Sequence, residues 1–141
     1  MNTERQARTG TARAALVPAH PAFVLLERAR TLLAEAGRAD SPEERFRLAH
    51  LAALRTGAAV LAQRGRPAAA RRRLVSVWVL LDSVAPELAP WATLFAAGAA
   101  TRAAVEAGAV GVVSSRAADD QLRAADEFLR LVASDAGLLA A

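Results

Sequence analysis

The segment SPEERFRLAHLAALRTGAAVL, residues 41–61, constrains the fold more than any other part of the chain. Ser41 can cap a helix N-terminus, Pro42 suits the first helical position, and Glu44 stands three residues after the serine, a combination known as a capping box. An almost unbroken apolar helix with a single histidine follows, and Gly65 is its predicted stop. The segment therefore predicts one long helix, and it contains no recognisable catalytic motif.

Four further helices are predicted from the spacing of apolar residues and from the positions of glycine and proline. Their approximate ranges are 21–36, 74–85 and 91–106, and the last helix begins at Ser115. In the helix over 91–106 we expect Leu94 to face inward, and in the loop that follows we expect Val110, Val112 and Val113 to form a small apolar plug. Residues 1–18 are polar and aperiodic, and we expect them to form a disordered tail. Residues 19–137 are then one all-α domain, a four- to five-helix up-and-down antiparallel bundle.

Composition supports this fold class and limits what the chain can be. Of 141 residues, 54% are hydrophobic and only 4% aromatic, and alanine, the strongest helix former, is the commonest. Trp78 and Trp91 are expected to anchor the core. The absence of cysteine excludes disulfides and fits a reducing compartment. The N-terminus lacks the apolar core of a signal peptide, and no apolar run approaches the ~20 residues that span a bilayer, so we expect a cytoplasmic protein.

The positive charge of the chain is concentrated in one place. All 18 basic residues are arginine, and the formal net charge is only +4. Five arginines lie within ten positions that contain no acidic residue, namely Arg64, Arg66, Arg71, Arg72 and Arg73. Because the planar arginine fork binds phosphate, this cluster is a candidate nucleic-acid-binding site. No aromatic residue is interleaved for base stacking, and a solvated loop without a ligand is the alternative interpretation.

His50 is the obvious candidate for acid–base chemistry, because histidine titrates near neutral pH. It falls near the middle of the apolar face of its helix, where no serine, acid or second histidine stands at helical spacing. The favoured interpretation is a neutral histidine in the core or in an interface. Arg45 precedes it by five residues, about 140° around a continuous helix, so the two side chains do not readily converge on one phosphate.

The acidic residues near the last predicted helix have structural interpretations. Asp119 and Asp120 suggest a metal pair, but adjacent residues on a helix point about 100° apart, and acids are expected in a first turn. We therefore expect no metal. The spacing also predicts outward ion pairs between Asp119 and Arg123 and between Asp126 and Arg130. No phosphate-binding loop, zinc spacing or nucleophile motif is present, and we expect no cofactor.

Three segments resemble the HEPN domain, in particular the small single-domain HEPN-like proteins of high-GC actinobacteria. They are SPEERFRLAHLAALRTGAAVL, WVLLDSVAPELAPWATLFAAGAATRAAVEAG and SRAADDQLRAADEFLRLV, and the resemblance covers about residues 21–135. It implies a helical bundle that often dimerises, with RNA-directed activity in many members. Active HEPN ribonucleases carry an arginine, four to six residues and then a histidine near the start of the last main helix, brought together across a dimer. Arg116 matches the arginine, but no histidine follows it.

The leading interpretation is a non-catalytic HEPN-like bundle, a homodimer that binds RNA or a partner protein. The alternative is a divergent, metal-independent HEPN ribonuclease in which Arg116 or Arg45 acts with His50 after converging across a dimer. A purely structural subunit, which packs one helix face against another protein, is a third possibility. None of these interpretations requires a cofactor, a metal or a membrane.

Overall fold

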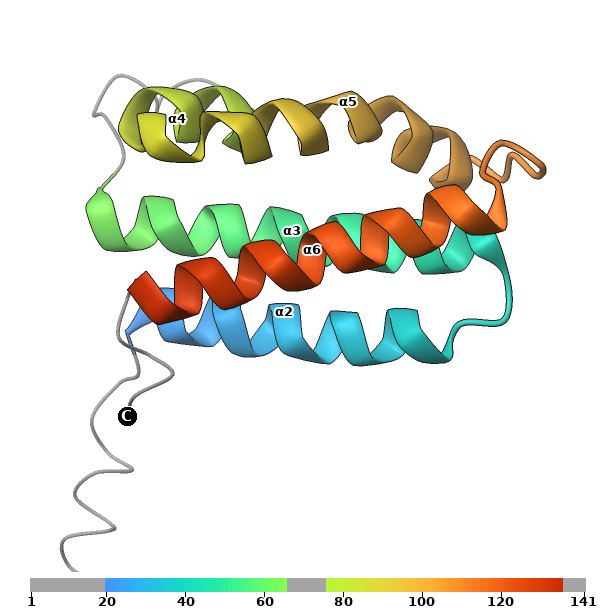
Figure 1. Ribbon diagram of the computed structural model, residues 1–141, viewed down its shortest axis with the longest axis horizontal. Coiled ribbons are helices and arrows are strands. Elements are labelled where there is room, and N and C mark those ends of the chain that lie inside the picture. Colours follow the sequence, from blue (N-terminus) through green and yellow to red (C-terminus); the bar gives the residue numbers. More distant parts are fainter. Residues whose placement is uncertain (1–19, 66–75, 136–141) are drawn as a thin grey trace, which may run out of the picture.

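The computed structural model describes residues 20–65 and 76–135, which form five α-helices and no strand. The helices are α2 (Pro21–Arg38), α3 (Pro42–Arg64), α4 (Val77–Val84), α5 (Ala89–Glu106) and α6 (Ser115–Asp135), with a 3-10 turn, η2 (Pro86–Leu88), between α4 and α5. Helices α2, α3, α5 and α6 alternate in direction (Figure 1). The predicted all-α antiparallel bundle is therefore confirmed. The predicted tail, residues 1–18, lies outside the described residues, and the domain limits 19–137 stay a prediction.

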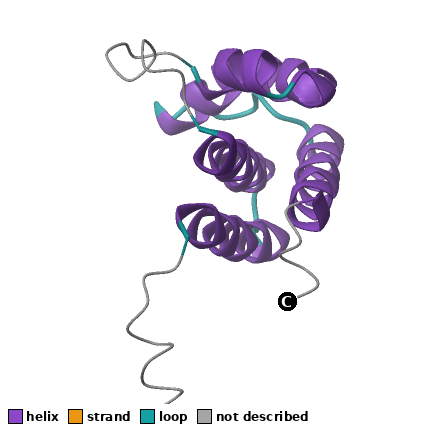
Figure 2. Ribbon diagram, turned by 90° about the vertical axis from the view of Figure 1, so that its left-hand side faces the viewer, coloured by secondary structure: helices purple, strands orange, loops and turns teal. Residues whose placement is uncertain are grey.

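Helix α3 occupies the centre of the bundle. It contacts α2, α4, α5 and α6, and in the view turned by 90° it lies between α2 and the α4–α5 layer, with α6 alongside (Figure 2). Eleven of its 23 residues are buried. Five of those eleven are alanine or glycine, whose small side chains let neighbouring helices approach closely. Helix α3 is apolar around most of its circumference because other helices pack against it on several sides.

Local chemistry sets both ends of α3 as the sequence predicts. The Ser41 hydroxyl oxygen accepts a hydrogen bond from the Glu44 backbone N–H at 3.1 Å, which satisfies one of the free donors of the first turn. Glu43 and Glu44 place negative charge near the positive end of the helix dipole. Gly65 ends the helix with φ of 88°, a conformation that favours glycine.

Aromatic rings from α4, α5 and α6 fill the core beside α3. The ring centroids of Trp78 and Phe95 are 5.3 Å apart, and Phe95 and Phe128 are 5.4 Å apart. Trp91 stacks on Phe128 at 5.4 Å. Both tryptophans therefore anchor the core as expected, and they connect α4, α5 and α6 through contacts that favour offset or tilted rings.

The junction between α4 and α5 differs in detail from the sequence-based expectation. Helix α5 begins at Ala89 instead of Trp91, because η2 runs directly into it and Pro90 stands in the first turn, where no backbone N–H is required. Leu94, which we expected to face inward, is 46% exposed. It lies next to the fully buried Phe95 and is therefore rotated by about 100° from it around the helix.

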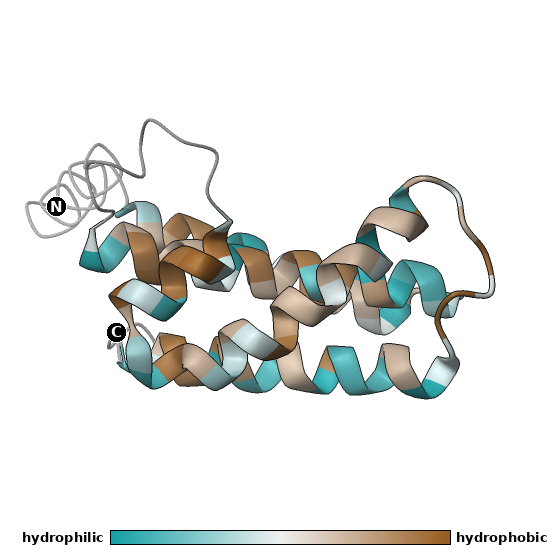
Figure 3. Cartoon of the chain, turned by 90° about the horizontal axis from the view of Figure 1, so that it is seen from above, coloured by the Kyte–Doolittle hydropathy of each residue, from teal (hydrophilic) through white to brown (hydrophobic). Residues whose placement is uncertain are grey.

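The loop between α5 and α6 contributes one residue to a second, smaller core. Val113 is buried with Phe46 and Ala118, whereas Val110 and Val112, expected to join it in an apolar plug, are exposed. This loop is visible as a brown segment when the molecule is seen from the α4–α5 side (Figure 3). Among the described helices, none is both long and apolar enough to cross a bilayer.

Candidate functional site

His50 is enclosed at the point where α3 meets α4 and α5. Its side chain is fully buried, and its Nε2 lies 2.8 Å from the backbone oxygen of Phe95. The ring stacks on Phe46, with centroids 6.1 Å apart, and meets Trp78 edge-on at 6.0 Å. On its remaining side stands Gly98, where an added Cβ would lie 3.1 Å from His50 Cδ2. The interpretation of His50 as a core histidine is confirmed.

The hydrogen bond of His50 shows which ring nitrogen carries a hydrogen, and its burial disfavours the charged form. A carbonyl oxygen only accepts, so Nε2 carries the hydrogen and donates it to Phe95, and Nδ1 keeps a lone pair. Nδ1 is buried and has no partner. Burial lowers the pKa of His50, an effect that the Phe95 carbonyl opposes and the nearby Arg102 charge reinforces. Burial and the lack of a partner for Nδ1 therefore favour the neutral imidazole, and the ring has no exposed surface.

Arg45 has a structural task in this chain. Its Nη1 lies 2.8 Å from Asp119 Oδ1 on α6, and its Nη2 donates to the Ala39 backbone oxygen at 2.8 Å. The guanidinium thus connects α3, α6 and the turn after α2. The predicted pairing of Asp119 with Arg123 is wrong, because Asp119 binds Arg45 and Arg123 instead pairs with Asp120.

The second predicted pair on α6 is present. Asp126 Oδ2 lies 3.0 Å from Arg130 Nε, the expected i,i+4 contact. Near the start of the same helix, Arg116 is exposed. No hydrogen bond or ion pair within residues 20–65 and 76–135 joins Arg116 or Arg45 to His50. The structure of one chain therefore does not bring together the side chains that the ribonuclease alternative requires.

Of the five arginines in the predicted cluster, only Arg64 is among the described residues. Arg66, Arg71, Arg72 and Arg73 fall outside the described residues. Arg64, at the end of α3, forms an ion pair with Glu87 of η2. The backbone N–H of Glu87 and the Arg64 guanidinium lower the pKa of that carboxyl. One member of the cluster is therefore already paired within the chain.

Two polar residues that the sequence analysis missed stand on the inner faces of α5 and α6. Arg102 lies on the stripe of Phe95, Gly98 and Val105. Its buried Nη1 has no acceptor among the described residues, and its Nε has only the ion pair with Glu106, without hydrogen-bond geometry. Gln121 is only 8% exposed, and its Nε2 likewise has no acceptor. A guanidinium and an amide on core-facing stripes are unusual, because a buried donor without a partner costs about 1–3 kcal/mol.

Arg102 and Gln121 belong to two helices that meet at a few places. Phe95 of α5 contacts Phe128 of α6, and Val105 of α5 packs against the small cluster of Phe46, Val113 and Ala118. Glu106 partly neutralises the guanidinium, with 3.1 Å between Arg102 Nε and Glu106 Oε1.

Two signals in the sequence could have revealed these two polar residues. Arg102 follows Gly98 by four residues on an otherwise apolar stripe. Gln121 follows Arg116 with four residues between them, the spacing at which the HEPN resemblance would place a histidine. Chemically, they offer hydrogen-bond donors but no nucleophile or general base. Within the described residues no cluster of three histidine, cysteine or acidic side chains could hold a metal ion.

Comparison with known proteins agrees with this architecture. A family model described as HEPN-like matches residues 36–133, well over half of the chain. The matched range contains all of α3, α4 and α5 and nearly all of α6. Searches of curated proteins and of solved structures give no match.

Proposed function

Since the chain belongs to the HEPN family, we propose that it is a non-catalytic member that binds RNA through the arginines between α3 and α4. The observation that carries the non-catalytic part is the enclosure of His50. A general base must come within about 2.6–3.2 Å of the proton it removes, or act through one water. The ring of His50 is fully buried, and its Nε2 is already bonded to Phe95.

The other histidine of the chain does not replace it. His20 stands before α2, where its Nδ1 accepts a hydrogen bond from the Ala22 backbone N–H at 3.0 Å. Arg45 is likewise engaged, by Asp119 and by the Ala39 carbonyl. His50, His20 and Arg45 are therefore engaged within the bundle, whereas Arg116 is exposed on α6 with no histidine beside it in the sequence.

Charge supports the RNA-binding part of the proposal. The described residues contain 11 arginines and 13 acidic residues, a formal charge of −2. Residues 66–75 contain Arg66, Arg71, Arg72 and Arg73 and no acid, a formal charge of +4. Because RNA attraction without sequence preference follows from neutralised phosphates, this segment is the favoured attachment point. Arg64 contributes less, because Glu87 already neutralises it.

Fluorescence anisotropy of a labelled single-stranded RNA tests this proposal. Binding should weaken with salt, and Arg71→Ala, Arg72→Ala and Arg73→Ala together should reduce the slope of log K against log salt by about 2. The matched control removes three exposed arginines that have no ion pair among the described residues, through Arg28→Ala, Arg38→Ala and Arg55→Ala. Equal losses in both triple variants would remove the argument for a local site.

The same samples, run on a denaturing gel, test the absence of cleavage. We expect intact RNA at every protein concentration. Cleavage that disappears in His50→Asn or Arg116→Ala would replace the proposal with the ribonuclease alternative. Absence of binding even at low salt would leave the arginines as a solvated loop and direct attention to protein partners.

A homodimer and a cytoplasmic location complete the proposal. The HEPN resemblance implies dimerisation, and exposed Phe23 and Val24 on α2, which are 41% and 51% exposed, offer apolar surface for it. The lack of cysteine supports a reducing compartment. Light scattering coupled to size exclusion measures the mass directly, and a monomer at all concentrations would remove the dimer from the proposal.

A further inference from the structure

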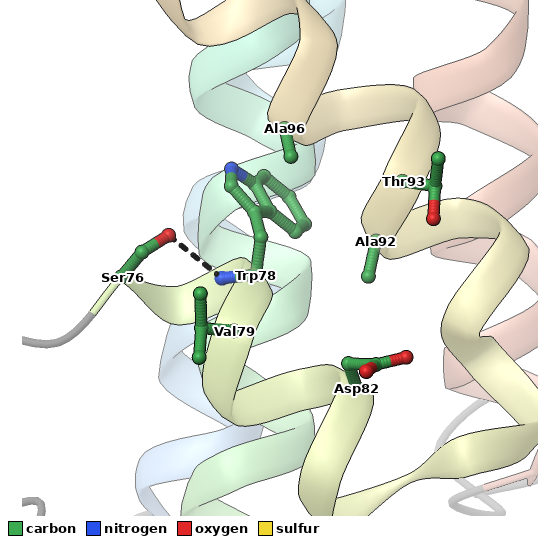
Figure 4. A pocket seen from close by; sticks show the side chains of 7 residues that line it. All are labelled: Ser76, Trp78, Val79, Asp82, Ala92, Thr93 and Ala96. Carbon is green, nitrogen blue, oxygen red and sulfur yellow. Dashed lines mark hydrogen bonds between the residues drawn. The ribbon is translucent and has the colours of Figure 1, made fainter.

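A groove lies between α4 and the first half of α5. Its described lining includes an acidic side chain and no basic one, unlike the arginine cluster proposed to bind RNA. Residues Ser76, Trp78, Val79 and Asp82 line one side, and Ala92, Thr93 and Ala96 line the other (Figure 4). Its volume is about 270 Å³. That is slightly below the range of about 300–1,000 Å³ typical of sites that enclose a whole small ligand. The groove therefore has room for one large side chain.

Apolar side chains predominate among the described residues that line the groove. Val79, one of them, is 62% exposed. Helix α5 has no charged residue from Ala89 to Thr101, although several positions on it are exposed. Exposed apolar surface around a small recess is typical of contacts with another macromolecule.

Among the described residues that line the groove, Asp82 is the only charged one. It is exposed and forms no ion pair with any described residue. The Ser76 hydroxyl is already occupied, since it accepts a hydrogen bond from the Trp78 backbone N–H at 3.2 Å. The groove thus combines apolar walls with one available carboxylate. Long basic side chains match that combination, because an apolar stem leads to a cationic head.

We propose that this groove docks a partner protein by receiving an arginine or lysine side chain flanked by apolar residues. The basic head pairs with Asp82, the stem lies along Ala92 and Ala96, and the flanking apolar residues cover Val79. The exposed surface beyond the recess favours a protein over a free small cation, since only a larger partner covers it. The chain would then have two binding surfaces of opposite charge, and this one does not depend on RNA binding.

Two other occupants fit the groove less well. RNA is disfavoured because Asp82, the one charged residue in the described lining, repels phosphate. A second copy that pairs groove against groove across a two-fold axis would bring two Asp82 carboxylates together. Both occupants give distinguishable results in the experiment below.

Nuclear magnetic resonance of the full chain provides the test, because its two tryptophans give two indole N–H signals. Trp78 lines the groove and Trp91 packs on Phe128, and Trp91→Phe assigns the two signals. The probe is the tripeptide acetyl-Leu-Arg-Leu-amide, with acetyl-Leu-citrulline-Leu-amide as its uncharged match. We expect the arginine peptide to shift the Trp78 indole and the amides of Thr93 and Ala96 saturably, and to leave the Trp91 indole unchanged.

Charge variants complete the experiment. Asp82→Asn should weaken binding of the arginine peptide about three- to fivefold, in keeping with an exposed ion pair. Replacement of arginine by citrulline in the peptide should weaken binding to the wild type equally. Glu127→Gln, which removes an exposed acid on α6, should change nothing. The proposal is overturned if no saturable shift occurs or if neither Asp82→Asn nor citrulline weakens binding. It is also overturned if an RNA oligonucleotide, or a second copy detected by dilution of the protein alone, perturbs the same signals instead.

Discussion

Gly98 of α5 lies so close to His50 of α3 that an added Cβ would be 3.1 Å from His50 Cδ2 and 3.5 Å from its Nε2. The same Cβ would be 3.1 Å from Phe46 Cζ. The buried imidazole and the glycine are thus a matched pair, since the histidine can reach the Phe95 carbonyl only where the facing helix has no side chain. The absence of a side chain at Gly98 therefore allows α5 to approach α3 closely at this point.

Gly98→Ala should therefore destabilise the bundle, although alanine is the better helix former. We expect the free energy of unfolding to fall by about 1–2 kcal/mol, because neither ring can move without disturbing the core. Urea denaturation followed by circular dichroism measures the change. Gly37→Ala on α2 is the matched control, since nothing lies within 4 Å of its Cβ position. It should leave stability equal or higher, and equal effects of both substitutions would show that the approach at Gly98 is not tight.

The lowered pKa of His50 predicts how stability changes with pH. The folded protein disfavours the imidazolium, so between the folded pKa and the ordinary histidine pKa of about 6.5 the unfolded chain binds more protons. The contribution of His50 is fully present above that value and is lost as pH falls below it, by at most about 1.4 kcal/mol per pH unit.

Urea denaturation at a series of pH values from about 7.5 down to about 5 measures this slope for the wild type and for His50→Asn. The variant lacks the titrating group, so its stability should change less over the same interval. A wild-type slope identical to that of the variant would show that His50 titrates equally in the folded and unfolded states. The neutral state inferred from the burial of His50 would then be wrong.

Much of this fold could be predicted from the sequence, because its helix boundaries depend on local chemistry. Ser41, Pro42 and Glu44 are close together in the chain, and they specify the start of α3 without help from distant residues. The burial of His50 was also predictable, since helical periodicity alone places it on an apolar face. A single helix carries enough information for both conclusions.

The interactions that distinguish this chain depend instead on how helices pair. Arg45 and Asp119 are 74 residues apart, and the burial of Arg102 and Gln121 depends on the helices packed around them. Periodicity gives the face on which a residue lies but gives no register between two helices. For this reason, the sequence analysis assigned Asp119 to Arg123 and overlooked Arg102 and Gln121.

The unpaired amide of Gln121 predicts a stabilising substitution. Gln121→Leu keeps a similar volume and removes a buried donor that has no acceptor. The free energy of unfolding should therefore rise by about 1 kcal/mol. Thermal and urea unfolding both report it. Gln63→Leu, at an exposed position near the end of α3, is the control and should have little effect. Destabilisation by Gln121→Leu would mean that the amide nitrogen has an acceptor in solution.

Because Arg45 contacts both α6 and the turn after α2, Arg45→Gln should destabilise the bundle more than Asp119→Asn does. The side chain of Asp119 is 51% exposed, so solvent screens the ion pair, and Asp119→Asn should cost about 0.5 kcal/mol or less. Arg45→Gln also removes the bond to the Ala39 carbonyl, which adds about 1 kcal/mol. A double-mutant cycle in urea isolates the coupling between the two side chains, which should stay below about 1 kcal/mol. A larger coupling, with equal losses in the two single variants, would show that the ion pair and not the backbone contact fastens α3 to its neighbours.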